Sequence, residues 1–182
     1  MLDTASPLDV IAELFEYPAA GYQGHLDSAA AVIACTDAAA AEHVQAFADT
    51  VRGRSLSEME ELYIQTFDLN PDACLDIGWH LFGEDYARGE FLVRLRQEMR
   101  RYGVAERDEL PDNLLTVLSL AARMPEEEAA PFRVRFLRPA VEKIRKAVPA
   151  ENNPYASLLA ALAVLLGGAE SGTEHPEGRE HE

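Results

Sequence analysis

The chain has 182 residues, of which 48% are hydrophobic and 26% charged, a balance that suits one globular domain with a substantial core. Its formal net charge of −16 argues against nucleic acid as a partner, because the two would repel each other. Two cysteines cannot build a disulfide framework, no secretory signal is evident, and the longest apolar run, residues 156–166, is shorter than the roughly 20 residues that cross a bilayer. We therefore expect a cytoplasmic protein without stable membrane insertion.

The charge is unevenly distributed along the chain. Residues 1–87 contain sixteen Asp or Glu and two basic residues, whereas residues 88–147 contain thirteen Lys or Arg and ten acids. The first half therefore carries a strong negative field that would attract a basic partner. The same acidity would also serve solubility alone, so charge by itself leaves both roles open.

The first three expected helices lie in the acidic half. Ser6 is a candidate N-cap, Pro7 suits the first helical position, and Pro18 lies beyond the helix end. Two alanine-rich segments, residues 22–34 and 37–51, follow as the second and third helices.

The next helix has two possible starts, because Ser55 with Glu58 and Ser57 with Glu60 both form the capping-box pattern. A turn at "DLNPD" follows it. Residues 73–82 are then expected to form a short buried helix.

Residues 85–102 show the clearest amphipathic pattern, with apolar residues on one side and arginines on the other. Gly103 is expected to end this helix. Its arginines are best explained as a solvated face that makes pairs four residues apart, such as Arg94 with Glu98.

The last part of the chain is also helical. One helix is expected between Pro111 and Pro125, and residues 127–147 continue helical with a kink at Pro139. The final helix begins after residues 153–154 and ends at two glycines.

These signals predict an all-α, single-domain helical bundle of about eight or nine helices over residues 1–167. No segment shows the strict alternation of a half-buried strand, and no Gly-rich phosphate loop or fixed-period repeat is present in the sequence. Residues 168–182 lack apolar anchors and are expected to form a disordered acidic tail.

The stretch "DIGWHLFGEDYARG", residues 76–89, concentrates the candidate chemistry. Its Trp79 and His80 precede a pair of acids, Glu84 and Asp85, which either cap the next helix or form the rim of a site. A small hydrolase-like enzyme using His80 and a neighbouring carboxylate is one hypothesis. A structural subunit of a membrane redox complex is another.

Cys74 with His80 could form a nucleophilic pair, but a reactive thiolate needs positive surroundings. Cys74 instead lies between Asp72 and Asp76 in the sequence, which would raise its pKa. The Cys and His residues also lack the spacing of a zinc site. We therefore expect no catalytic residues and no bound metal.

Three spaced motifs point to a family. They are "Y-x3-FD" at residues 63–68, "H-x2-G-x4-RG" at 80–89 and "ELPD-x-L" at 109–114. With these motifs the chain resembles the NarJ-type nitrate reductase assembly chaperones, within the TorD/DmsD class of molybdoenzyme maturation proteins.

The resemblance implies an all-helical cytoplasmic chaperone that is not an enzyme and holds no cofactor of its own. Its expected partner is the catalytic subunit of a molybdoenzyme, foremost respiratory nitrate reductase. It would bind that subunit's N-terminal leader and hold the subunit for molybdenum cofactor insertion and complex assembly. We expect a monomer or a weak homodimer.

A helix-in-groove site for such a leader needs an apolar floor and a charged rim. The motif residues and their neighbours supply candidates for both. The predicted peptide-binding residues are Tyr63, Phe67, Asp68, Trp79, His80, Glu84, Asp85, Arg88, Leu110, Pro111 and Asp112.

Overall fold

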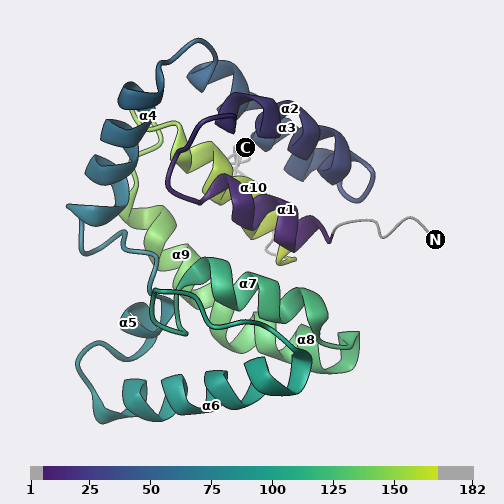
Figure 1. Cartoon of the computed structure of the whole chain (residues 1–182), viewed down its shortest axis with the longest axis vertical. Helices are drawn as coiled ribbons and strands as arrows, with labels where there is room; N and C mark the ends of the chain where they lie inside the picture. The colour runs from purple at the N-terminus through teal and green to yellow at the C-terminus, as the bar shows by residue number, and fades with distance from the viewer. Residues whose placement is uncertain (1–5, 168–182) are drawn as a thin grey trace, which may run out of the picture.

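The computed structural model describes residues 6–167, and this part of the chain is built from helices and connecting loops (Figure 1). In chain order the elements are α1 (Pro7–Leu14), α2 (Tyr22–Ala34), α3 (Ala38–Val51), α4 (Leu56–Tyr63), the π-helical η1 (Ile64–Asp68), α5 (Ile77–Phe82), α6 (Tyr86–Tyr102), α7 (Leu114–Arg123), α8 (Glu126–Phe132), the π-helical η2 (Arg133–Leu137), α9 (Arg138–Ala147) and α10 (Tyr155–Leu165).

If α4 with η1 is counted as one rod and α8, η2 and α9 as another, these elements make nine rods. The prediction of an all-α bundle of eight or nine helices is therefore confirmed. The acidic tail predicted at residues 168–182 lies outside the described residues.

The helices form two groups, one above the other in Figure 1. The upper group contains α1, α2, α3 and α10, with α4 and η1 along one edge, and the lower group contains α5, α6, α7 and α8. Helix α1 packs against α7, and α9 packs against both α5 and α10, so the two groups share contacts. One continuous hydrophobic core runs through both groups.

Helix α10 lies at the centre of the upper group, where it packs against α3, α1 and α9. Its sequence is apolar around its whole circumference, as expected for a helix covered on several sides. Tyr155 at its start is fully buried among four other aromatic rings. These belong to Phe15, Phe47, Tyr63 and Phe67, with ring centroids 4.8–6.5 Å from that of Tyr155.

Side-chain caps determine where several helices begin. The Ser6 hydroxyl accepts the backbone N–H of Leu8, and Asn113 accepts that of Leu115. Ser55 and Glu58 form the complete capping box of α4. The alternative box from Ser57 does not form, because α4 already begins at Leu56 and Ser57 lies inside it.

The helix across residues 126–147 continues past Pro139, with a wide π-turn just before the proline. The backbone N–H of Arg138 bonds to the carbonyl of Arg133, five residues earlier, at the end of η2. Pro139 follows directly within this continuous helix, where it has no N–H to donate to the preceding turn. Where the sequence predicts a kink, the structure has a π-turn that ends next to Pro139.

The charged face of α6 pairs differently from the prediction. Glu98 contacts Arg101 at 3.4 Å, three residues away, and not Arg94. Arg101 also forms a two-pronged pair with Glu128 of α8, with both N–O distances 2.9 Å. Arg101 therefore joins a partner within α6 to a partner on α8.

The capping box predicts a stability difference between two neighbouring serines. Ser55→Ala removes the acceptor for the Glu58 N–H and should cost about 1 kcal/mol of the free energy of unfolding. Ser57→Ala, inside the same helix, should be neutral or slightly stabilising because alanine is the better helix former. Thermal and urea unfolding measure both changes, and equal losses would show that the box contributes nothing.

Candidate functional site

The motif residues meet at a corner formed by α5, α6 and the segment before α7. Asp112 is fully buried there, and Arg88 of α6 donates from Nε to its Oδ2 at 3.0 Å, with Nη2 in ion-pair contact with the same oxygen at 2.9 Å. The same Nη2 contacts Asp76 at 3.2 Å. One arginine thus joins two acids that lie 12 and 24 residues from it in the sequence.

The backbone holds the same corner. The segments that precede α5 and α7 form an isolated antiparallel bridge, in which Ile77 donates to the carbonyl of Asp112 at 2.9 Å and Leu114 donates to that of Leu75 at 2.7 Å. A glycine is required at position 78, in the first turn of α5, because a Cβ there would overlap Oδ2 of Asp112. The Arg88 guanidinium also lies over the Trp79 ring, 5.9 Å from its centroid.

The charges at this corner act on one another. Burial raises the pKa of Asp76, the negative charge of Asp112 raises it further, and the Arg88 guanidinium opposes both effects. The pKa of Arg88 is raised by its hydrogen bond and charge interaction with Asp112, which outweigh partial burial. The arginine therefore stays charged, and its role at the corner is to neutralise buried carboxylates.

His80 is part of this scaffold. Its side chain is buried, and its Nε2 lies 2.7 Å from the carbonyl oxygen of Cys74, to which it must donate a proton. Lys143 of α9 donates to the backbone carbonyl of His80. Both contacts tie α5 to its surroundings.

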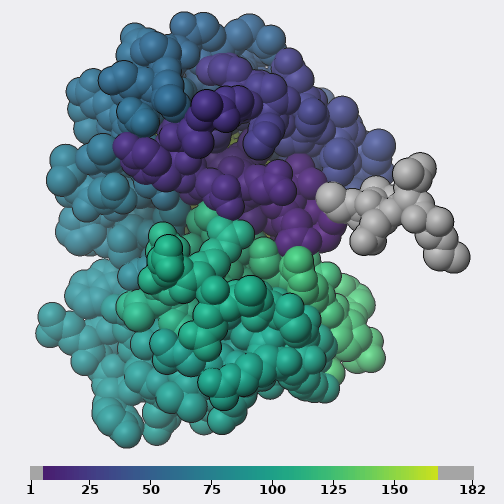
Figure 2. Space-filling model, viewed as in Figure 1, coloured from purple at the N-terminus to yellow at the C-terminus, as the bar shows by residue number. Residues whose placement is uncertain are grey.

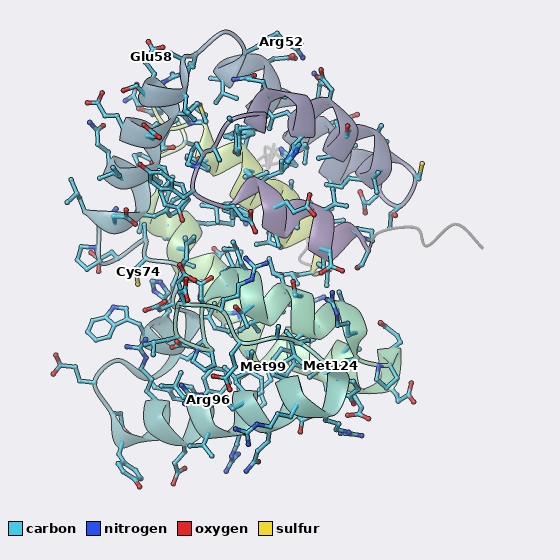
Figure 3. All side chains as sticks on the ribbon, in the orientation of Figure 1. Arg52, Glu58, Cys74, Arg96, Met99 and Met124 are labelled. Atoms are coloured by element: carbon cyan, nitrogen blue, oxygen red, sulfur yellow. The ribbon has the colours of Figure 1, made fainter. Side chains whose placement is uncertain are left out.

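The thiol of Cys74 is 3.7 Å from the same Nε2, at the edge of the molecule between the two helix groups (Figure 3). Since that nitrogen already donates to a carbonyl, it is not available to take the thiol proton. Burial raises the pKa of Cys74, and the charges of Asp76 and Asp112 add to the effect. The sequence correctly predicted the direction of the shift, but burial and Asp112 contribute where Asp72 was expected to.

Of the two acids after Gly83, Asp85 caps α6. Its Oδ1 accepts the backbone N–H of Ala87 at 2.8 Å, while Glu84 is exposed and has no hydrogen-bond partner among residues 6–167. Of the two roles considered for these acids, helix cap or rim of a site, Asp85 therefore has the first. Both side chains remain exposed, so a second role as the rim of a site stays a prediction.

The structure divides the predicted site residues by exposure. The buried ones are Phe67, His80, Pro111 and Asp112. The partly buried ones are Tyr63, Trp79 and Arg88, and the exposed ones are Asp68, Glu84, Asp85 and Leu110. In this conformation the buried side chains lie beneath the surface, where they support the exposed residues next to them in the chain.

A surface feature that the sequence did not reveal lies beside these motifs. Tyr17, which follows α1, packs edge to face on Tyr63 of α4 with ring centroids 5.3 Å apart, and it is 49% exposed. Burial raises the pKa of Tyr63, and the negative charges of Asp68, Glu109 and Glu16 raise it further. We call these five residues the tyrosine–carboxylate surface.

Apolar side chains continue this surface. Leu69, next to Asp68, is 73% exposed, and Leu110, next to Glu109, is 45% exposed. The segment that contributes Glu109 and Leu110 joins α6 to α7 and crosses the front of the lower group in Figure 1. In Figure 2 it lies at the molecular surface, below α1. Each of these exposed apolar residues therefore adjoins a carboxylate in the chain.

A pocket of about 470 Å³ between α6 and α8–η2 was also not predicted. Phe132 and Phe136 line it, with Arg94 and Arg135 among the charged residues. None of the predicted site residues lines this pocket. The apolar residues in these two segments predict from the sequence that the helices pack together. They do not predict that a pocket remains between them.

Two further properties concern the part of the chain that the structure describes. Its His, Cys, Asp and Glu residues include no group of three placed to hold a metal ion. None of its helices has the length and apolarity needed to cross a membrane.

Because Arg88 pairs with the buried Asp112, we predict that it is essential for the stability of the fold. Arg88→Met leaves the Asp112 carboxylate buried without its partner, which should cost about 3–5 kcal/mol of the free energy of unfolding. Adding Asp112→Asn should restore part of the loss, because the uncompensated charge is then gone. Urea unfolding measures both variants. Arg94→Met, on the same helix but exposed and without an ion pair in residues 6–167, is the control and should change stability by less than about 0.5 kcal/mol.

Comparison with known proteins shows which family this chain belongs to. The family described as nitrate reductase delta subunit matches residues 33–164, well over half of the chain and all three motifs. Comparison with curated proteins found no match. The family match confirms the resemblance seen in the sequence. This chain belongs to the nitrate reductase delta subunit family, a family of molybdoenzyme maturation chaperones and not of enzymes.

Proposed function

We propose that this protein is a cytoplasmic assembly chaperone for respiratory nitrate reductase. It binds the N-terminal leader of the catalytic subunit and holds that subunit while the molybdenum cofactor is inserted and the complex is assembled. Membership of the nitrate reductase delta subunit family supports the chaperone role. The client and the leader segment are the further steps of the proposal.

The tyrosine–carboxylate surface is the observation that best supports peptide binding. Tyr17, Leu69 and Leu110 provide exposed apolar area, and Asp68 and Glu109 provide carboxylates without ion-pair partners among residues 6–167. An apolar floor with a charged rim is the arrangement that binds an amphipathic segment. The negative charge selects a segment that is basic as well as apolar.

The buried corner has a supporting role in this proposal. Arg88 and Asp112 fix the start of α7, and with it the end of the segment that carries Glu109 and Leu110. Positions held by a buried pair stay preorganised, which lowers the entropy lost on binding. Glu84 and Asp85 could extend the acidic rim toward α6.

Co-purification tests the function as a whole. The tagged protein, expressed with its nitrate reductase, should be recovered with the catalytic subunit before cofactor insertion and be absent from the mature complex. Deleting the leader from the catalytic subunit should abolish recovery. A protein that stays in the mature complex at unit stoichiometry would instead be a structural subunit.

Charge variants test the surface. Asp68→Asn with Glu109→Gln should weaken binding of a synthetic leader peptide several-fold, mainly by lowering the association rate, and the affinity should fall with salt because exposed charges are screened over about 10 Å at 0.1 M. Stopped-flow fluorescence measures the rate. Glu90→Gln with Glu127→Gln changes the net charge equally on α6 and α8 and is the matched control. Equal slowing by both pairs would mean that only the overall charge matters.

A further inference from the structure

We infer that the pocket between α6 and α8–η2 binds an acidic amphipathic helix of a partner protein, with Arg94 and Arg135 as the residues that recognise its charge. This site is separate from the tyrosine–carboxylate surface, and its partner carries the opposite charge from the leader. We call the pocket the phenylalanine groove. Its apolar floor consists of Phe91, Leu95, Met124, Phe132 and Phe136.

The groove has the shape of a site for a third helix. Its lining residues on α6 are at positions 91, 94, 95 and 98, which is the spacing of one helix face over two turns. On α8 and η2 the lining positions 128, 132, 135 and 136 cover a similar length. A hollow between two neighbouring helical rods accepts side chains spaced by three, four and seven residues on a third helix.

The floor is aromatic and already assembled. The ring centroid of Phe136 lies 5.1 Å from that of Phe91 and 5.3 Å from that of Phe132. Phe132 and Phe136 are only partly buried, so they offer apolar area to a ligand, and the guanidinium of Arg135 lies over the Phe136 ring, 5.3 Å from its centroid. A preorganised aromatic cluster binds apolar side chains with little loss of entropy.

The rim of the groove is positive, although the whole chain carries a net charge of −16. The two acids that line the groove, Glu98 and Glu128, both pair with Arg101, at 3.4 and 2.9 Å. Arg94 and Arg135 are exposed and form no ion pair with any residue of the described range 6–167. Two unpaired guanidinium groups beside an apolar floor select a ligand that carries carboxylates next to its apolar face.

The remaining candidates for the occupant belong to this chain, and both fit less well. Residues 168–182 contain five glutamates but no Leu, Ile, Val, Met or aromatic side chain, so they have nothing to fill the floor. A second copy would have to place its acidic half on the groove of the first, and such a contact between unlike faces continues as an open chain of copies. A different protein therefore fits the groove best.

The test compares two pairs of arginines. Arg94→Gln with Arg135→Gln removes the charge of the groove. Arg54→Gln with Arg100→Gln is the matched control, because these arginines are also exposed, form no ion pair within residues 6–167 and do not line the groove. Both pairs change the net charge by the same amount, and Arg100 lies on α6 with Arg94. Thermal melts verify that each variant folds.

The probe is a synthetic amphipathic peptide of about 18 residues, long enough to form a helix, with leucines along one face and glutamates beside them. One analogue has glutamine in place of glutamate, and another has alanine in place of leucine. Fluorescence anisotropy measures the affinity of the full chain for each in about 0.15 M salt, where charges more than about 8 Å away are largely screened.

We expect the Arg94 and Arg135 double variant to bind the glutamate peptide about fivefold more weakly than the control double variant, the size of two lost surface pairs. The glutamine analogue should bind both variants equally, and the alanine analogue should bind neither. Equal affinities of the two variants for the glutamate peptide would overturn the inference, as would a failure of the unsubstituted chain to bind it.

Two further outcomes would assign the groove to this chain itself and would also overturn the inference. One is an increase in mass with protein concentration, measured by sedimentation, that Arg94→Gln with Arg135→Gln abolishes. The other is tighter binding of the glutamate peptide once glutamine replaces the acids of the tail, Glu170, Glu174, Glu177, Glu180 and Glu182. Each of these results leaves the proposed function untouched, because leader binding is measured separately with a basic peptide.

Discussion

The ion pair between Arg88 and the buried Asp112 is the constraint on which the lower half of the molecule depends. An isolated carboxylate in this position would be strongly destabilising, so the arginine has to reach it from α6. That requirement sets how α6 meets α5, and it explains the glycine at position 78, where a side chain would occupy the place of the carboxylate oxygen. The ordered start of α7 follows from the same contact.

The corner and the surface beside it differ in how easily their interactions change. Arg88 is bound to a side chain with no exposed area, so breaking that pair leaves a buried charge. The pair between Arg107 and Glu16 is open to water, and its loss exposes nothing new. The molecule thus contains one pair that burial fixes and one pair that can be broken at low cost.

Much of this fold could be predicted from the sequence because its signals are local. A serine three residues before a glutamate limits the start of α4 to two positions, of which Ser55 is the actual cap, and the glycine at position 103 marks the end of α6. Contacts between distant segments leave no such signal. The pairs of Arg88 with Asp112 and Arg107 with Glu16 span 24 and 91 residues, and nothing in the sequence shows which of these charges meet.

The candidate site shows the same limit. The structure brings several of the motif residues together at one corner, but the motifs highlight residues for being distinctive, and several of these side chains are buried. Tyr17 was overlooked because it lies between a helix end and Pro18, where the sequence indicates only a stop. Its importance depends on Tyr63 packing against it, and that contact exists only once α1 and α4 are placed together.

The position of α10 has a consequence for how the protein comes into being. This helix fills the centre of the upper group and covers α1 and α3, which were synthesised more than 100 residues earlier. Until α10 leaves the ribosome, the faces of α1 and α3 that it covers lack this partner, and such unfinished intermediates are prone to aggregate. Closure through contacts this distant in sequence is also intrinsically slow. The upper group is therefore packed completely only when almost the whole chain has been synthesised.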